Sequence, residues 1–137
     1  MAGSPRPEEG DEYTVERTFT TADVRTFGEL SGDRQAIHTE PDEEGRLVVQ
    51  GLLTGTLPTA IGADLQVLAR RMDLEFVRPV YTGERITCTW TNDSVEPRDD
   101  GVSIRATAIC TNEAGERVLE AEIAGVIRAG DHGPSSH

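Results

Sequence analysis

The chain has 137 residues, enough for one domain of ordinary size but too few for two. Acidic residues outnumber basic residues 25 to 13, giving a net charge of -12, and every basic residue is an arginine. A surface this negative repels nucleic acid and anionic lipid, so neither is an expected partner. No apolar run approaches the roughly 18 residues that span a bilayer, which favours a soluble, cytoplasmic protein.

The excess of acidic side chains has two interpretations. Their mutual repulsion destabilises the folded state, and salt at roughly 1 M relieves this by shortening the Debye length to about 3 Å. The composition therefore favours a halophilic source. The alternative is an acidic protein from a GC-rich genome, in which arginine codons are preferred to lysine codons.

A short strand is expected at 13–19, where apolar and polar residues alternate. A helix follows, because Thr20 or Thr21 can act as N-cap and Asp23 stands in the first turn, where the helix dipole favours an acid. The apolar side chains of this helix recur at three-residue spacing. We expect it to end close to Gly32.

The segment 47–69 is apolar on nearly every side, which is typical of a buried helix. Pro58 interrupts this pattern, because a proline in a helix interior removes one backbone hydrogen bond and clashes with the preceding turn. Two outcomes remain open. The helix kinks at this point, or it begins late with Thr56 as its cap.

From residue 71 the hydrophobic period changes to two, which indicates strands. The first would be half-buried, with its apolar residues on one face, and Gly- or Pro-containing turns separate it from three further strands. The apolar residues of the four strands are Met72, Leu74 and Phe76; Ile86, Cys88 and Trp90; Val102, Ile104, Ala106, Ala108 and Cys110; and Leu119, Ala121, Ile123, Gly125 and Ile127. An α+β domain in which one antiparallel sheet covers the apolar helix is the simplest architecture.

The composition of the two ends predicts disordered tails at 1–11 and 130–137 around a single domain at 12–129. The two cysteines, Cys88 and Cys110, have no spacing typical of a metal site, so we expect no zinc. Buried free thiols are the favoured state. If their strands form a hairpin, a disulfide is the alternative.

His38 is the only histidine inside the predicted domain, and Asp33 precedes it by five residues. Taken alone, an aspartate after a glycine is typical of a turn, and a single histidine of a satisfied polar group. Together, an acid and a histidine in one irregular segment can act as a general acid and base on a shared water. Their co-occurrence favours a catalytic pair.

The surrounding residues resemble the MaoC-like family of (R)-specific enoyl-CoA hydratases, which have the hot-dog fold, a curved antiparallel sheet wrapped around a central helix. The similarity covers residues 13–128. The matching positions are Phe27, Leu30, Ser31, Asp33, Ile37 and His38 in the hydratase segment, Val49 and Gly51 before the central helix, and Pro79, Val80, Gly83 and Glu84 in a later turn. The chain departs from the family pattern at Gln35, Ala36 and Gln50.

The resemblance implies a cofactor-free hydro-lyase that adds water across a trans-2-enoyl-CoA, or removes it from a 3-hydroxyacyl-CoA, as in fatty acid metabolism. Asp33 and His38 would be the catalytic residues. The backbone N–H of Gly51 would bind the thioester oxygen, and Gln50 and Thr59 are further candidates for substrate contact. The family also implies a homodimer or a higher homo-oligomer.

Two other functions remain open for this fold. One is an acyl-CoA thioesterase, and the other is a non-catalytic acyl-CoA-binding subunit in which Gln35, Ala36 and Gln50 mark lost chemistry. A cluster of arginines can bind the phosphates of coenzyme A or can simply form the polar faces of strands paired with acids: Arg70, Arg71, Arg78 and Arg85.

Overall fold

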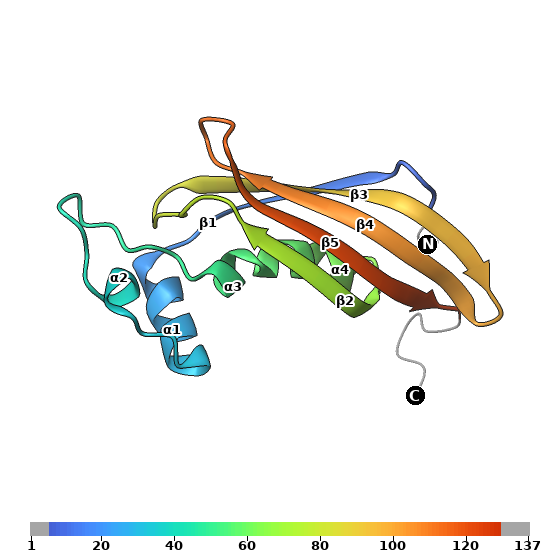
Figure 1. Ribbon diagram of the computed structural model, residues 1–137, viewed down its shortest axis with the longest axis horizontal. Coiled ribbons are helices and arrows are strands. Elements are labelled where there is room, and N and C mark those ends of the chain that lie inside the picture. Colours follow the sequence, from blue (N-terminus) through green and yellow to red (C-terminus); the bar gives the residue numbers. More distant parts are fainter. Residues whose placement is uncertain (1–5, 130–137) are drawn as a thin grey trace.

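The computed structural model describes residues 6–129 (Figure 1). Of the tails predicted at 1–11 and 130–137, residues 1–5 and all of 130–137 lie outside the described residues. The elements, in chain order, are β1 (Glu12–Thr18), α1 (Thr21–Ser31), α2 (Ala36–Thr39), α3 (Gly51–Thr54), α4 (Thr56–Asp64), β2 (Leu68–Phe76), β3 (Arg85–Arg98), β4 (Gly101–Thr111) and β5 (Arg117–Arg128).

The five strands form one antiparallel sheet in the order β1-β3-β4-β5-β2. The sheet curves around α4, and α1 and α2 lie together beyond one end of that helix (Figure 1). This is the α+β hot-dog arrangement expected from the sequence. The long β3–β4 and β4–β5 hairpins follow the predicted turns, because each turn contains a glycine with positive φ, Gly101 or Gly115.

The core lies between the sheet and the helix. Trp90 of β3 is 1% exposed, and its indole N–H donates to Asn92 Oδ1 at 2.8 Å, which satisfies the only polar group of the ring. A Cβ atom added to Gly62 of α4 would lie 3.4 Å from the Trp90 ring, so the helix approaches the sheet closely. Buried apolar side chains from both layers surround this contact: Leu57, Ile61, Ile86, Cys88, Ala106, Ala108 and Ile123.

The central helix is divided by Gly55 into α3 and α4, which places the break three residues before Pro58. Pro58 is the third residue of α4, where a backbone N–H has no intrahelical acceptor and its absence costs little. The alternative in which the helix begins late with Thr56 as its cap was wrong about the cap residue. Gly55 precedes α4, whereas the Thr56 hydroxyl donates to the Leu53 carbonyl at 2.6 Å.

Strand β2 differs from the prediction of a half-buried strand. Met72 is 39% exposed and Phe76 is 53% exposed, and only Leu74 packs against the core. The reason is position: β2 is an edge strand, paired with β5 on one side only. The alternating sequence predicted the strand correctly, but the predicted burial of its apolar face was wrong.

Cys88 and Cys110 lie directly opposite each other in the β3–β4 ladder, and both are buried free thiols, the favoured alternative. A hydrogen bond between the two thiols lowers the pKa of Cys88. The same bond, together with burial, raises the pKa of Cys110.

The described part of the predicted N-terminal tail is attached to the sheet. Gly10 N–H donates to the Asn92 carbonyl at 2.8 Å, and Asn92 donates from its backbone to Asp11 and from its side chain to the Glu8 carbonyl. Composition alone indicated disorder for residues 1–11. It did not reveal that buried Asn92 offers these partners.

Candidate active site

Helix α1 ends two residues before Asp33 and so positions it. Its N-terminus is fixed by a capping box, in which Thr20 Oγ1 accepts from Asp23 N–H at 3.1 Å and the Asp23 carboxylate accepts from Thr20 N–H at 2.9 Å. Its C-terminus is Gly32 with φ 83°, a left-handed conformation that glycine adopts without strain. The chain therefore turns sharply immediately before Asp33.

A closed loop brings His38 back to the start of the central helix. Asp42 Oδ1 accepts the Arg46 backbone N–H at 2.8 Å, a bond that holds the pKa of the Asp42 carboxyl below its usual range. Beyond this turn, Val48 N–H donates to the Ile37 carbonyl at 3.0 Å. The turn thus places α2 beside the segment that leads into Gly51.

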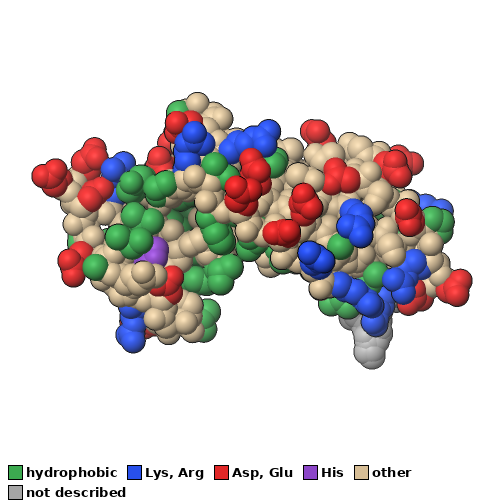
Figure 2. All heavy atoms as spheres, in the orientation of Figure 1, with side chains coloured by type: hydrophobic (Ala, Val, Ile, Leu, Met, Phe, Trp, Pro, Cys, Tyr) green, Lys and Arg blue, Asp and Glu red, His purple; other side chains and the backbone are tan. Residues whose placement is uncertain are grey.

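Asp33 and His38 lie together, as the sequence predicted. Asp33 Oδ2 is 3.6 Å from His38 Nε2, and the two side chains are 36% and 6% exposed. The separation is longer than a direct hydrogen bond and leaves both atoms available to the same water. Figure 2 shows the histidine at the bottom of a shallow hollow lined by hydrophobic side chains.

The protonation of the His38 ring follows from its second contact. Nδ1 lies 2.6 Å from the Val48 carbonyl oxygen, which can only accept a hydrogen bond. Nδ1 therefore carries the proton, and in the neutral ring Nε2 has the free lone pair. That lone pair is on the side of Asp33.

Two glutamines contact Asp33, a feature that sequence reasoning missed. Gln35 Nε2 donates to Asp33 Oδ1 at 2.9 Å. Gln50 Nε2 donates to the Asp33 carbonyl at 3.4 Å and to the Val24 carbonyl at 2.9 Å. The only signal in the sequence was that both positions depart from the family pattern.

Gly51 is the first residue of α3, so its N–H has no intrahelical acceptor. A Cβ atom at this position would lie 2.7 Å from the Phe76 ring, closer than real Cβ contacts. Glycine is therefore required for Phe76, at the end of β2, to pack over the start of the helix. Gly51 directly follows Gln50, whose side-chain amide donates to the Asp33 carbonyl.

The remaining predicted substrate contacts are placed differently. The Gln50 side chain is 1% exposed and its amide is bonded to backbone, so it does not face solvent. Thr59 is exposed, and its hydroxyl donates to the Gly55 carbonyl of its own helix at 3.0 Å. It lies eight residues beyond Gly51, about 12 Å along a helix axis. The predicted contact of Thr59 with the substrate stays a prediction.

The arginine cluster divides into two pairs. Arg78 and Arg85 each form an ion pair with an acid of the β4–β5 turn, at 3.8 Å to Glu116 and 3.8 Å to Glu113. These two follow the strand-face alternative. Arg70 and Arg71, on the edge strand β2, have no ion pair within residues 6–129.

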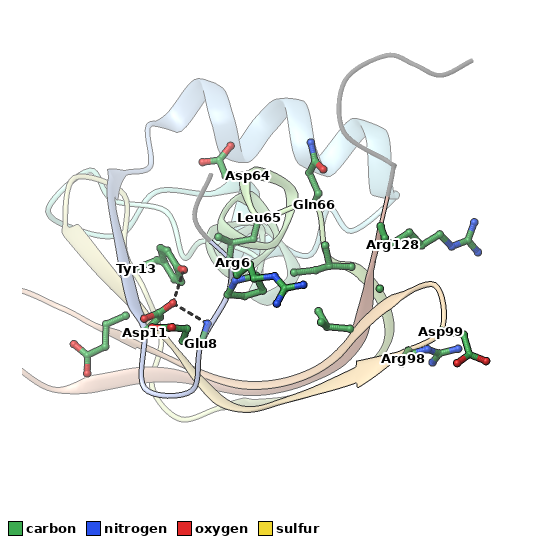
Figure 3. Close-up of a pocket in the computed structure, with 16 residues that line it drawn as sticks. Arg6, Glu8, Asp11, Tyr13, Asp64, Leu65, Gln66, Arg98, Asp99 and Arg128 are labelled. Atoms are coloured by element: carbon green, nitrogen blue, oxygen red, sulfur yellow. Dashed lines mark hydrogen bonds between the residues drawn. The ribbon is translucent and has the colours of Figure 1, made fainter. Parts of the chain in front are cut away.

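A separate cavity of about 1350 Å³ lies at the other end of α4 (Figure 3). Its wall includes Leu65 and Gln66 just beyond α4, the β3–β4 turn and residues 6–13, but neither Asp33 nor His38. Five acidic and three arginine side chains line it: Glu8, Asp11, Glu12, Asp64, Asp99, Arg6, Arg98 and Arg128. Because acidic and basic side chains are mixed along its wall, this cavity favours neither anionic nor cationic ligands. The Asp33 and His38 pair therefore remains the candidate site.

Within the part of the chain that the structure describes, no three His, Cys, Asp or Glu side chains are grouped to hold a metal ion. Over the same residues, no helix has the length and apolar character needed to cross a membrane.

No model of a protein family matches this chain, and no curated protein sequence does either. Solved structures do match it. The R-hydratase PhaJ1 of Pseudomonas aeruginosa is 21% identical, with 89% of this chain and 83% of that chain covered and a TM-score of 0.80. The MaoC-like dehydratase of Rhodospirillum rubrum is 17% identical, with coverages of 89% and 94% and a TM-score of 0.73.

A third match is the HadBC complex, a 3R-hydroxyacyl-ACP dehydratase of Mycobacterium tuberculosis, at 18% identity, coverages of 87% and 96% and a TM-score of 0.66. These likenesses show that the chain has the hot-dog fold of R-hydratases and MaoC-like dehydratases. The resemblance identified from the sequence is thereby confirmed at the level of the fold.

Proposed function

We propose that this protein is a hydro-lyase of the MaoC-like type, which hydrates an (R)-type trans-2-enoyl thioester or dehydrates the 3-hydroxyacyl thioester. The observation that carries the proposal is the pairing of Asp33 Oδ2 with His38 Nε2 at 3.6 Å, with the imidazole tautomer set by Val48. The fold shared with R-hydratases supports the same reaction class.

In this mechanism one water binds between the two side chains. His38 Nε2 and the Asp33 carboxylate orient it, and together they take one proton as its oxygen forms a bond to C3 of the substrate. They return one proton to C2, so the reaction consumes one water and no net proton. The N–H of Gly51 stabilises the negative charge that develops on the thioester oxygen.

Coenzyme A is the proposed carrier of the acyl chain. Arg70 and Arg71 supply positive charge on β2, whose last residue, Phe76, occupies the space that a Cβ on Gly51 would need. Two arginines without acidic partners among residues 6–129 are suited to phosphate oxygens, because guanidinium groups bind phosphate in a bidentate manner.

The proposed assembly is a homodimer. Several exposed large apolar side chains lie on or just after β2 and near the site, and an edge strand that exposes apolar side chains is a surface that proteins normally cover. The residues are Leu68, Met72, Phe76, Val77, Ile37 and Leu52. A second copy of the chain that pairs along β2 would cover most of them.

The test is turnover of crotonyl-CoA and of a longer enoyl-CoA by the purified wild-type chain at molar salt. Hydration removes the absorbance of the conjugated double bond and releases no thiol, which is the expected result. Release of free coenzyme A, measured with a thiol reagent, would instead identify a thioesterase. Binding without either change would identify a non-catalytic acyl-CoA-binding subunit.

A further inference from the structure

Two glutamine amides converge on Asp33 from different parts of the chain. Gln35 lies two residues after it and donates to the carboxylate, whereas Gln50 lies at the start of the central helix and donates to the Asp33 main-chain carbonyl. Both are positions at which the chain departs from the MaoC-like pattern. Two departures that meet on the same residue suggest a joint role.

The contact with Gln35 fixes the rotation of the Asp33 carboxylate, so that one oxygen is held by Gln35 and the other faces the histidine. Asp33 is 36% exposed, so its carboxylate would otherwise rotate freely about its terminal bond. With Oδ1 engaged by Gln35 at 2.9 Å, Oδ2 is the oxygen directed to His38 Nε2. Asp33 N–H also donates to Ser31 Oγ at 3.0 Å, which fixes the backbone of the same residue.

Gln50 makes its contacts at the cost of one buried polar atom without a partner in the described part of the chain, which indicates that its amide has a specific role. Both hydrogens of the amide are used, one on the Val24 carbonyl of α1 and one on Asp33, while Oε1 is buried with no partner among residues 6–129. A leucine would fill the same space without a buried unpaired oxygen. What the amide adds is the connection between α1, the Asp33 loop and the residue before Gly51.

The packing of α1 preserves this connection. A Cβ atom at Gly28 would lie 3.3 Å from the Asp33 carbonyl oxygen and 3.4 Å from Gln50 Nε2. Because glycine has no side chain, the helix can approach without displacing the amide. Gly28 is buried, and its position therefore serves the junction on which Asp33 rests.

We propose that Gln35 and Gln50 are positioning residues for Asp33. Gln35 fixes the rotation of the carboxylate, and Gln50 fixes the backbone that carries it relative to His38 and Gly51. The inference rests on the proposed hydration. Gln35 contacts the Asp33 carboxylate and Gln50 the Asp33 main-chain carbonyl, and neither is assigned a proton-transfer role.

Gln35→Leu is the first test, since the side chain is exposed and its loss does not disturb the core. Misplacing a reacting group can cost up to about 100-fold in rate, so we expect kcat to fall by tenfold or more, with KM and melting temperature little changed. Gln35→Asn, which keeps the amide donor on a shorter side chain, should recover part of the loss. Glu40→Leu, in the same loop and without a side-chain hydrogen bond to Asp33, is the matched control.

A double-mutant cycle separates positioning from a general effect on the loop. If Gln35 acts through the Asp33 carboxylate, Gln35→Leu should lower kcat strongly in the wild-type background and hardly at all in the Asp33→Asn background. Gln50→Leu should show the same non-additivity with Gln35→Leu, and should also lower the melting temperature because it removes the buried hydrogen bond from Gln50 to the Val24 carbonyl. Additive losses would overturn the proposal. If Gln50→Leu does not fold, the Gln35 cycle decides alone.

A measurement without turnover keeps this result distinct from failure of the proposed function. Long-range ¹H–¹⁵N spectra report the two ring nitrogens of His38, assigned by their absence in His38→Gln. Gln35→Leu should move the Nε2 signal, which senses the neighbouring carboxylate, and Glu40→Leu should leave it in place. If the wild-type chain hydrates nothing, the proposed function fails and these spectra still decide whether Gln35 positions Asp33. An unchanged Nε2 signal in Gln35→Leu would overturn that positioning role.

Discussion

His38 has one ring nitrogen occupied by a backbone carbonyl and the other directed at a carboxylate, and this division of contacts sets its chemistry. A base needs a free lone pair, and Nε2 has one because Nδ1 donates to Val48. A carboxylate alone at this place would bind water without choosing which proton leaves. In the proposed hydration, the pair would take a proton from the water that adds to C3 and return one to C2.

Asp33→Asn and His38→Gln should each abolish most of the hydration while the fold is retained. Loss of one general acid or base typically costs about 10²- to 10⁴-fold in rate, and residues that act as a unit give a double variant little worse than either single one. The measurement is loss of enoyl absorbance at saturating substrate, after each variant has been checked for a native melt. Near-wild-type turnover in either would show that the pair is not catalytic, since a turn aspartate accepts asparagine with almost no loss.

The sequence placed the acid and the histidine correctly because the two are close along the chain and joined by a short loop. It could not place their supporting contacts in the same way. The bond from Gln50 to Val24 joins residues that are 26 positions apart, and the Val48 carbonyl that fixes His38 is identified only once the loop closes. The Gln35 contact is local, yet many rotamers of an exposed glutamine are possible and only packing selects one.

Among the elements, β2 carries exposed apolar side chains that a single chain leaves uncovered. A strand that pairs with a second copy of itself around a twofold axis perpendicular to the sheet must be centred on a residue, so only a few registers exist. Centring on Arg71 or on Asp73 opposes identical charges at the axis, and centring on Leu74 opposes Asp73 to the second copy's glutamate at 75. Centring on Met72 places Arg71 opposite Asp73 of the second copy, which favours that register.

Met72→Cys should therefore form a covalent dimer under mild oxidation. Residues directly opposite in an antiparallel pair have Cα atoms roughly 4.5–5.5 Å apart, within the range of a disulfide. Non-reducing electrophoresis provides the measurement, and native Cys88 and Cys110 do not interfere because both are fully buried.

Leu68→Cys is the matched control. In the Met72-centred register its two copies are about 27 Å apart at 3.4 Å per residue, so it should stay uncrosslinked. Crosslinking of Leu68→Cys but not of Met72→Cys would point to another register. A monomeric wild-type chain by light scattering at high salt would exclude the dimer itself.

The central helix shows a second limit of what the sequence predicts for single elements. Its buried character followed from its composition, and the break before Pro58 followed from the chemistry of proline. The residue that forms the break could not be chosen, since Gly55 and Thr56 both suit a helix end. The exposed face of β2 was also beyond reach, because alternation reports which residues share a face but not whether anything covers it.

At the scale of the whole molecule, charge is the dominant feature. Acidic side chains are spread over the face shown in Figure 2, with arginines between some of them. The ion pairs among residues 6–129 are on exposed or partly exposed side chains, apart from His38 with Asp33, and exposed pairs contribute little to stability. They do not offset a net charge of -12, so repulsion remains in the folded state.

The melting temperature should accordingly rise with salt. Between dilute buffer and roughly 2 M KCl the Debye length falls from tens of ångströms to about 3 Å or less, and the repulsion between excess carboxylates falls with it. Thermal unfolding followed by circular dichroism measures the effect. Screening should deliver most of the rise below about 1 M, where the Debye length has already reached 3 Å, whereas an excluded osmolyte such as sucrose stabilises without screening and provides the control. A melting temperature that stays constant or falls across the KCl series would contradict the halophilic interpretation and favour the GC-rich alternative, in which arginine replaces lysine for reasons of coding alone.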